Sequence, residues 1–295
     1  MHFWPPTQSP MKLRAGSGGA GIDDLRKHYD TLFQRFGAAP AGVAVRPGQL
    51  GAIPGEWLGG ETSRVLLYFH GGGYIAGSPE SHRPLAARLV EQSGVGAFSV
   101  KYRLAPECFF PAAVRDGLDA YRALLATGMP GSSIILAGDE AGGGLAFAVA
   151  LAVRNANLTL PGGIVALSPW ADMTLSGWSM LGNRKTDTML DWEFLFACAR
   201  HSLRKSNPGD AYASPAFASF KDFPPVMVHA GALEVLRDDA SRLGDRAAEA
   251  DLTVSVEIYD GMGHLFQADP RLPEARASLG RLAQFIKAKT AALAA

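Results

Sequence analysis

The sequence predicts an α/β fold in which helices cover both faces of a mostly parallel central sheet and a small helical cap lies over one end. After residue 59, short apolar runs alternate with helical segments, which is the pattern of consecutive βαβ units. Several of these runs end in loops rich in glycine or containing histidine, and open parallel sheets place their sites at those ends. The 295 residues are close to the upper limit for one core, so a single domain, 1–295, is expected.

The first 60 residues are expected to form a helix followed by extended chain. Apolar side chains recur there at intervals of three and four residues and mark one helical stripe: Ile22, Leu25, Tyr29, Leu32, Phe33 and Phe36. Farther along, the predicted strands are 64–69, 95–100, 133–137, 163–167, 225–230 and 253–258. Helices with apolar faces of period 3.6 are predicted at 111–125, 141–155, 237–250 and 274–290. Right-handed crossovers then distribute these helices over both faces of the sheet.

One segment interrupts this alternation. Residues 170–210 are rich in Trp, Met and Phe and contain a helical pattern near 191–204. We expect this segment, together with residues 1–40, to form the cap.

Composition excludes several classes of function. Hydrophobic residues make up 47% of the chain, and 28 basic side chains balance 28 acidic ones, so nothing electrostatic favours nucleic acid or an anionic membrane. The two cysteines, Cys108 and Cys198, have neither disulfide-framework nor metal-type spacing, so we expect a reducing cytoplasm and no metal. No signal peptide or membrane-spanning run is expected.

The first candidate for chemistry is a run of three glycines after the strand at 64–69. His70, Gly71, Gly72, Gly73 and Tyr74 follow each other where the chain leaves the sheet. Consecutive glycines allow a tight turn and expose backbone N–H groups, which can stabilise a developing oxyanion. An HGGG loop at this position is typical of the oxyanion element of lipases and esterases.

The second candidate is a sharp strand-to-helix turn at residue 140. Small residues flank Glu140 in the run GDEAGGG, which permits the strained turn that projects one side chain from the sheet. The N–H of Ala141 would lie at a helix N-terminus and point toward the same cavity as Gly71 and Gly72. In a G-x-S-x-G elbow the projecting residue is serine, whereas here it is Glu140.

Two residues near the C-terminus complete a constellation. Glu234 follows the predicted strand 225–230, and His264 follows the predicted strand 253–258. Both therefore lie just past the carboxyl ends of strands, in the order acid and then histidine. We expect their side chains to meet Glu140 in one pocket.

These motifs resemble a known family, the bacterial carboxylesterases and lactonases of the hormone-sensitive-lipase group, which includes monoterpene epsilon-lactone hydrolases. From about residue 42 onward, HGGGY, YRLAPE, GD-x-AGGG, SPW, EVLRDD and DGM-x-H-x-F occur in family order. The resemblance implies an α/β-hydrolase fold with Gly71, Gly72 and Ala141 as oxyanion donors, His264 as base and Glu234 as its orienting acid. It also implies that Glu140 stands where the family has its nucleophilic serine.

Four roles for Glu140 remain open. It could be a carboxylate nucleophile on sp³ carbon, as Asp is at this elbow in related epoxide hydrolases and haloalkane dehalogenases. It could act with His264 as general acid and base on a substrate whose carbonyl lies in the oxyanion hole, in lactone hydration, β-elimination, decarboxylation or cyclisation. It could pair with His264 and fill the oxyanion hole in a protein that only binds ligand; the plant gibberellin receptors are similar in fold and have lost a triad member. It could also be a deliberate or recent substitution in an ordinary esterase.

The sequence favours a hydrolase for esters or lactones over a non-hydrolytic binder or lyase on the same fold. The aromatic and Met-rich cap indicates a mainly apolar small-molecule substrate, with Tyr74, Trp170 and Met189 lining the pocket. No cofactor is expected. A homodimer through the last strand and helix is compatible with the apolar stripe of the last predicted helix.

Overall fold

The computed structural model describes residues 21–60 and 63–290 and contains an eight-stranded sheet of order β1-β2-β4-β3-β5-β6-β7-β8. Strands β1 (Val45–Leu50) and β2 (Ile53–Leu58) form an antiparallel hairpin, and β2 joins β4 in antiparallel fashion. The remaining strands are mutually parallel: β3 (Val65–Phe69), β4 (Gly96–Val100), β5 (Ile134–Asp139), β6 (Gly163–Leu167), β7 (Val226–Gly231) and β8 (Val254–Tyr259). The expected α/β-hydrolase architecture is confirmed.

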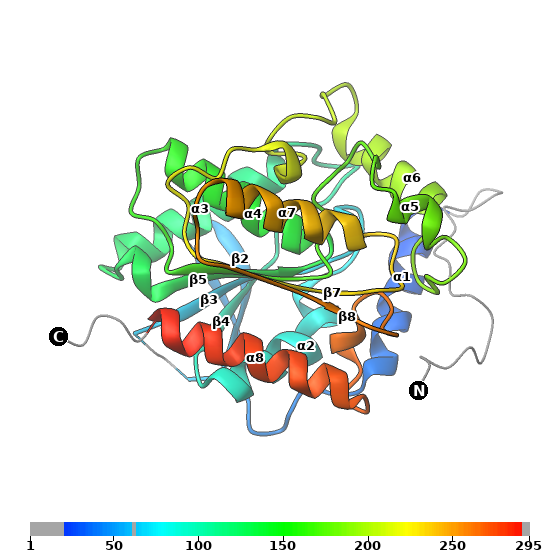
Figure 1. The fold of residues 1–295 in the computed structure, drawn as a ribbon. Coiled ribbons are helices and arrows are strands. Elements are labelled where there is room, and N and C mark those ends of the chain that lie inside the picture. Colours follow the sequence, from blue (N-terminus) through cyan, green and yellow to red (C-terminus); the bar gives the residue numbers. More distant parts are fainter. Residues whose placement is uncertain (1–20, 61–62, 291–295) are drawn as a thin grey trace.

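Helices cover both faces of this sheet (Figure 1). Helices α3 (Ala112–Ala126), α4 (Ala141–Asn155) and α7 (Arg237–Glu249) lie on one face, and α2 (Pro79–Ser93) and α8 (Pro273–Thr290) lie on the other. Strands β3 to β6 are buried along their whole length because both of their faces are covered. Their apolar runs are therefore continuous rather than alternating.

The sequence prediction missed three elements. The hairpin β1–β2 was expected only as extended chain, and α2 was not predicted. Pro47 and Pro54 interrupt the hairpin strands, and Pro84 lies inside α2, so propensity argues against all three elements. Proline is tolerated in the hairpin because β1 is an edge strand and Pro54 lies before Gly55, where the pairing of β2 with β4 begins.

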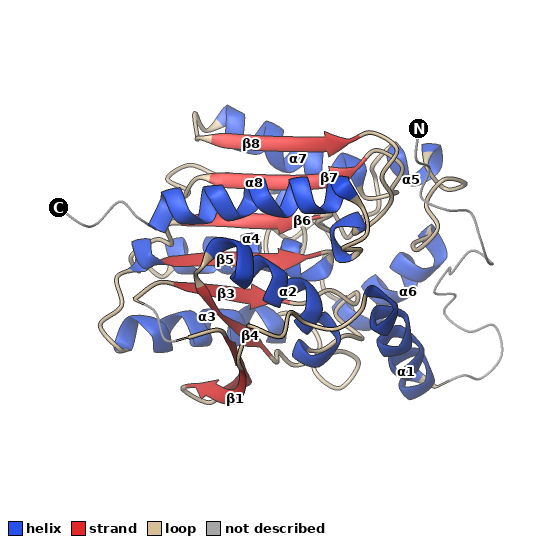
Figure 2. Cartoon of the chain, turned by 90° about the horizontal axis from the view of Figure 1, so that it is seen from below, coloured by secondary structure: helices blue, strands red, loops and turns tan. Residues whose placement is uncertain are grey.

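Three helices lie beyond the carboxyl ends of the parallel strands: α1 (Ile22–Phe33), α5 (Ser179–Gly182) and α6 (Trp192–Leu203) (Figure 2). The stripe predicted for α1 is buried at Tyr29, Leu32, Phe33 and, one turn later, Phe36. Arg26 ties α1 to the body of the protein by donating to the carbonyl of Ile75 at 2.8 Å and to Glu107. This placement is compatible with the predicted cap, of which residues 1–20 lie outside the described residues.

Four short 3₁₀ turns complete the described chain, at Gln34–Phe36, Gly131–Ser133, Pro215–Phe217 and Phe266–Ala268. Within residues 21–60 and 63–290, none of the helices combines the length and the apolar character that crossing a bilayer requires.

Candidate active site

Glu140 occupies the turn between β5 and α4, with backbone angles φ 48° and ψ −116° that are strained for any residue with a side chain. Neighbouring backbone holds this conformation: the N–H of Glu140 donates to the carbonyl of Leu167 at 3.0 Å, and its own carbonyl accepts from Trp170 at 2.8 Å. Gly142 lets α4 approach β3, because a Cβ there would lie 2.0 Å from the carbonyl oxygen of Phe69. The elbow geometry expected from the sequence is therefore present.

The carboxylate of Glu140 rests on the glycine loop. Its Oε2 atom accepts hydrogen bonds from the N–H groups of Gly72 at 2.5 Å and Gly73 at 2.9 Å. Gly72 has φ +116°, and a Cβ there would lie 2.2 Å from the carbonyl oxygen of Ala76, so only glycine fits. The loop thus presents a pair of adjacent amide donors to a negatively charged oxygen.

These two donors to the carboxylate overlap in part with the three residues expected as oxyanion donors. Gly72 is in both sets, Gly73 is in the first only, and the carbonyl of Gly71 accepts from Nδ1 of His70 at 2.7 Å. Ala141 is the buried first residue of α4, directly after Glu140, and its amide donates no hydrogen bond to the carboxylate. Three consecutive glycines carry no sequence signal that tells which amides point inward.

The second carboxylate oxygen of Glu140, Oε1, is buried and has no hydrogen-bond partner among the described residues. The whole residue is only 2% exposed. A buried acceptor without a donor costs about 1–3 kcal/mol, so this oxygen favours a water or a ligand hydroxyl beside it. Oε1 is therefore the free acceptor of the site.

His264 and Glu234 form a buried pair. Nδ1 of His264 lies 2.6 Å from Oε2 of Glu234, whose Oε1 accepts from the N–H of Gly231 at 2.8 Å. The loops that carry them are joined by backbone hydrogen bonds, since Leu233 donates to the carbonyl of Met262 at 3.0 Å. The structure thus brings together two of the residues that the sequence placed in one site.

The charges around His264 raise its pKa. Burial alone would lower the pKa of this imidazole, but the hydrogen bond and charge of Glu234, with the charges of Asp187 and Glu140, raise it to about 9. At neutral pH the imidazole is therefore protonated and available as a proton donor. The charge of Glu140 makes the smallest of these contributions to the raised pKa of His264.

Asp187 is a site residue that sequence reasoning missed. It lies between α5 and α6 and is buried, and its Oδ2 accepts from the N–H of Val235, next to Glu234, at 2.8 Å. Its Oδ1 accepts from the N–H groups of Met189 and Leu190, both at 2.9 Å. A single Asp in an irregular segment gives no sequence signal, so only the fold reveals this link to the acid loop.

The three expected pocket residues lie in different surroundings. Tyr74 directly follows the amide donors and lines a small cavity. Trp170 is almost wholly buried with its ring centroid 6.2 Å from that of Tyr74, and its Nε1 donates to the carbonyl of Asp172. Met189 is buried beside Asp187. Within the described ranges, no group of three or more His, Cys, Asp or Glu side chains is arranged to hold a metal ion.

Comparison with known proteins agrees with this geometry. A family model described as the alpha/beta hydrolase fold matches residues 66–268. An acetyl-hydrolase from Streptomyces hygroscopicus is 37% identical over 274 residues, covering 91% of each chain, and an esterase from Acinetobacter venetianus is 36% identical over 265 residues, covering 88% of this chain and 87% of its own. The crystal structure of an esterase from the bacterial hormone-sensitive lipase family superimposes with a TM-score of 0.90 at 35% identity, covering 95% and 96% of the two chains.

The chain therefore belongs to the α/β-hydrolase family of enzymes, and within it to the hormone-sensitive-lipase group.

Proposed function

We propose that the protein hydrolyses carboxylic esters or lactones, mainly apolar ones, with Glu140 and His264 as its acid–base groups and Glu234 orienting the imidazole. The relatives named acetyl-hydrolase and esterase support the substrate class. The single observation that carries the assignment of roles is the carboxylate of Glu140 on the amides of Gly72 and Gly73, because it marks where a substrate carbonyl oxygen would bind.

Glu140 stands where the family's nucleophilic serine belongs, but its geometry argues against the same covalent route. A glutamate oxygen lies four bonds from Cα and a serine oxygen two, which moves the reactive atom outward by roughly 2 Å, and a misplacement of about 1 Å can cost about a hundredfold in rate. Attack by a carboxylate on an ester would also form an anhydride. Acid–base catalysis does not require the glutamate oxygen to lie where a serine oxygen would, and it forms no anhydride.

Glu140 and His264 can together carry out the proton transfers that ester hydrolysis requires. The carbonyl oxygen of the ester accepts hydrogen bonds from the N–H groups of Gly72 and Gly73. Oε1 of Glu140, to which no group donates a hydrogen bond, removes a proton from the attacking water. The tetrahedral intermediate collapses as protonated His264 gives its proton to the leaving alcohol. The proton on Glu140 then returns to His264, which restores both groups.

The resting geometry slows this cycle. Oε2 must leave two charge-assisted hydrogen bonds, each worth about 1.5–3 kcal/mol, before a carbonyl can enter the hole. The native protein should therefore bind esters weakly.

A binding protein that does not turn over its ligand is the second candidate. The same observation favours it, because a carboxylate already fills the proposed oxyanion hole, and the imidazole of His264 is kept protonated by its pairing with Glu234. A ligand hydroxyl donating to Oε1 would suit such a protein.

Steady-state assays of nitrophenyl acetate, nitrophenyl butyrate and an apolar lactone separate the two candidates. Native turnover is expected to be slow but measurable and to fall about 10²–10⁴-fold in both Glu140→Gln and His264→Ala, since each removes one proton-transfer group. Glu140→Ser is expected to restore a nucleophile of normal reach and raise ester turnover.

If the native protein shows no turnover above these two variants while Glu140→Ser is active, the acid–base role of Glu140 is wrong and the binding protein, or a substituted esterase, remains. Inactivity of Glu140→Ser as well would remove the ester assignment itself.

A further inference from the structure

Helix α6 contacts the glycine loop at Gly73, the second amide donor to Glu140. Gly73 has no side chain, and a Cβ there would lie 2.5 Å from Sγ and 3.1 Å from Cβ of Cys198 on α6. One turn later on α6, the hydroxyl of Ser202 donates to the carbonyl of Gly73 at 3.4 Å. Cys198 and Ser202 are both buried, and their spacing places them on the same face of α6. This face therefore holds both the Cα and the carbonyl of Gly73.

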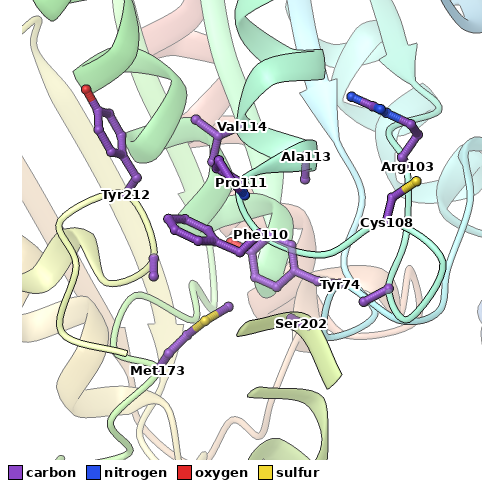
Figure 3. Close-up of a pocket in the computed structure, with 12 residues that line it drawn as sticks. Tyr74, Arg103, Cys108, Phe110, Pro111, Ala113, Val114, Met173, Ser202 and Tyr212 are labelled. Carbon is purple, nitrogen blue, oxygen red and sulfur yellow. The ribbon is translucent and has the colours of Figure 1, made fainter. Parts of the chain in front are cut away.

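Helix α6 is itself fixed to the body of the protein at its C-terminal end. The N–H of Phe110 donates to the carbonyl of Ser202 at 2.8 Å, and both residues border a small cavity beside Tyr74 (Figure 3). The guanidinium of Arg204, directly after α6, lies over the ring of Phe109, 4.5 Å from its centroid. Gly73 thus rests on a helix that the chain around residues 109–110 holds in place.

The two amide donors are held by different parts of the protein. The N–H of Gly72 shares a peptide plane with the carbonyl of Gly71, which accepts from Nδ1 of His70 at 2.7 Å, so this donor is fixed within the glycine loop. The N–H of Gly73 shares its plane with the carbonyl of Gly72, which accepts from the N–H of Ala76 at 2.8 Å. That turn restrains one side of the second donor, whereas the Cα and carbonyl on its other side lie against α6.

We infer that Cys198 and Ser202 are positioning residues for the N–H of Gly73, so that α6 sets one of the two oxyanion donors and leaves the other to the loop. The inference rests on the proposed function, in which this N–H binds the carbonyl oxygen of the ester. Donors to an oxyanion act at about 2.7–3.1 Å, which leaves little room for displacement. Any movement of α6 should therefore weaken the hole at Gly73 first.

The first test is spectroscopic and uses the native chain labelled with ¹⁵N-glycine. Cys198→Val adds volume on the side of α6 that touches Gly73, and it is expected to shift the amide proton of Gly73 more than that of Gly72. Ala197→Val is the matched control. It places the same β-branched side chain on α6 at a half-buried position, while the atoms nearest to Gly73 belong to Cys198 and Phe194. The control should leave both signals near their native positions.

The second test separates the kinetic constants in the Glu140→Ser chain with nitrophenyl butyrate as substrate. Adding Cys198→Val is expected to lower kcat at least about tenfold and at most about 10²–10³-fold, the cost of losing one oxyanion donor, with little change in KM. Adding Ala197→Val should change neither constant. Equal losses of kcat in the two variants would overturn the inference, because the whole helix and not the contact with Gly73 would then be responsible.

A pair of substitutions at Ser202 tests the second contact and replaces Cys198→Val if that variant does not fold. Ser202→Ala removes the hydrogen bond to the carbonyl of Gly73 and should shift the Gly73 amide, whereas Ser202→Thr keeps a hydroxyl and should not. Shifts of equal size at Gly72 and Gly73, or none at Gly73, in a folded variant would overturn the inference. Inactivity of Glu140→Ser would instead remove the proposed function, and the spectra of the native chain would still decide whether α6 positions Gly73.

Discussion

A glutamate oxygen reaches two bonds farther from Cα than a serine hydroxyl does, and at residue 140 this reach carries Oε2 onto the amides of Gly72 and Gly73. The two oxygens of one carboxylate are therefore in different states. Oε2 is bound by two donors, whereas Oε1 is buried without one. In the proposed mechanism, this difference lets the residue fill the oxyanion hole at rest and still offer a proton acceptor.

The pKa of His264 is a testable property of a single residue. With a hydrogen bond to Glu234 and the negative charges of Glu234, Asp187 and Glu140 acting on it, the imidazole should titrate near the pKa of about 9 rather than near its ordinary value of 6.5. NMR of ¹³C-labelled histidine reports this pKa directly. Glu234→Gln should lower it most, and Glu140→Gln should lower it less, because Glu234 also makes a hydrogen bond.

The raised pKa of His264 also determines how the stability of the folded protein changes with pH. A pKa raised in the folded state stabilises the fold fully below about 6.5, and that contribution is lost as pH rises through about 9. The free energy of unfolding should therefore decrease between these two values, and the decrease should be absent in His264→Gln. A native titration near 6.5, or a stability that does not depend on His264 in this range, would contradict the assigned cluster of charges.

At the scale of elements, the site depends on three segments that meet past the carboxyl ends of the strands. The loops after β7 and β8 carry Glu234 and His264 and are joined to each other by backbone hydrogen bonds. Asp187 adds the segment between α5 and α6, since one carboxylate binds amides on both that segment and the acid loop. The predicted cap would thus take part in holding the acid in place.

Asp187→Asn tests this link. The amide NH₂ cannot accept from the N–H of Val235, and the negative charge near His264 is removed, so the pKa of His264 should fall and ester turnover should decrease with a shifted pH profile. Asp191→Asn is the matched control, because Asp191 caps α6 through the N–H of Phe194 in the same segment and has no bond to the acid loop.

A decrease in activity with an unchanged His264 titration in Asp187→Asn would assign Asp187 a structural role only. Equal effects of the two substitutions on the titration would mean that the whole segment, and not this carboxylate, positions the pair.

At the scale of the whole molecule, the sequence predicted the parts in which local pattern and tertiary environment agree. The buried parallel strands are continuous apolar runs, and α4 has the bounds expected from its small-residue start and apolar body. The hairpin β1–β2 and helix α2 escaped prediction because their prolines contradict local propensity and only tertiary packing makes them stable. The Ser78–Ser81 capping box and Pro79 at the first turn were the signal that could have revealed α2.

The site residues also fall into those that local motifs predicted and those that only the fold reveals. Motif spacing placed Glu140, Glu234 and His264 at the ends of their strands because parallel topology brings those ends together. Which glycine amides donate to Glu140 depends on backbone angles within a run of identical residues, and the contacts of Asp187 depend on how the segment between β6 and β7 folds back. Neither is encoded in a local pattern.

The most direct test of the central claim is the hydrogen bonding of the two loop amides in the native protein. In ¹⁵N-glycine-labelled protein, the amide protons of Gly72 and Gly73 should lie downfield as donors to a carboxylate, and Glu140→Ala should move both upfield while the amide of Gly182, on the exposed end of α5, stays unchanged. Gly72 and Gly73 signals that do not respond to Glu140→Ala would show that the carboxylate does not occupy the oxyanion hole.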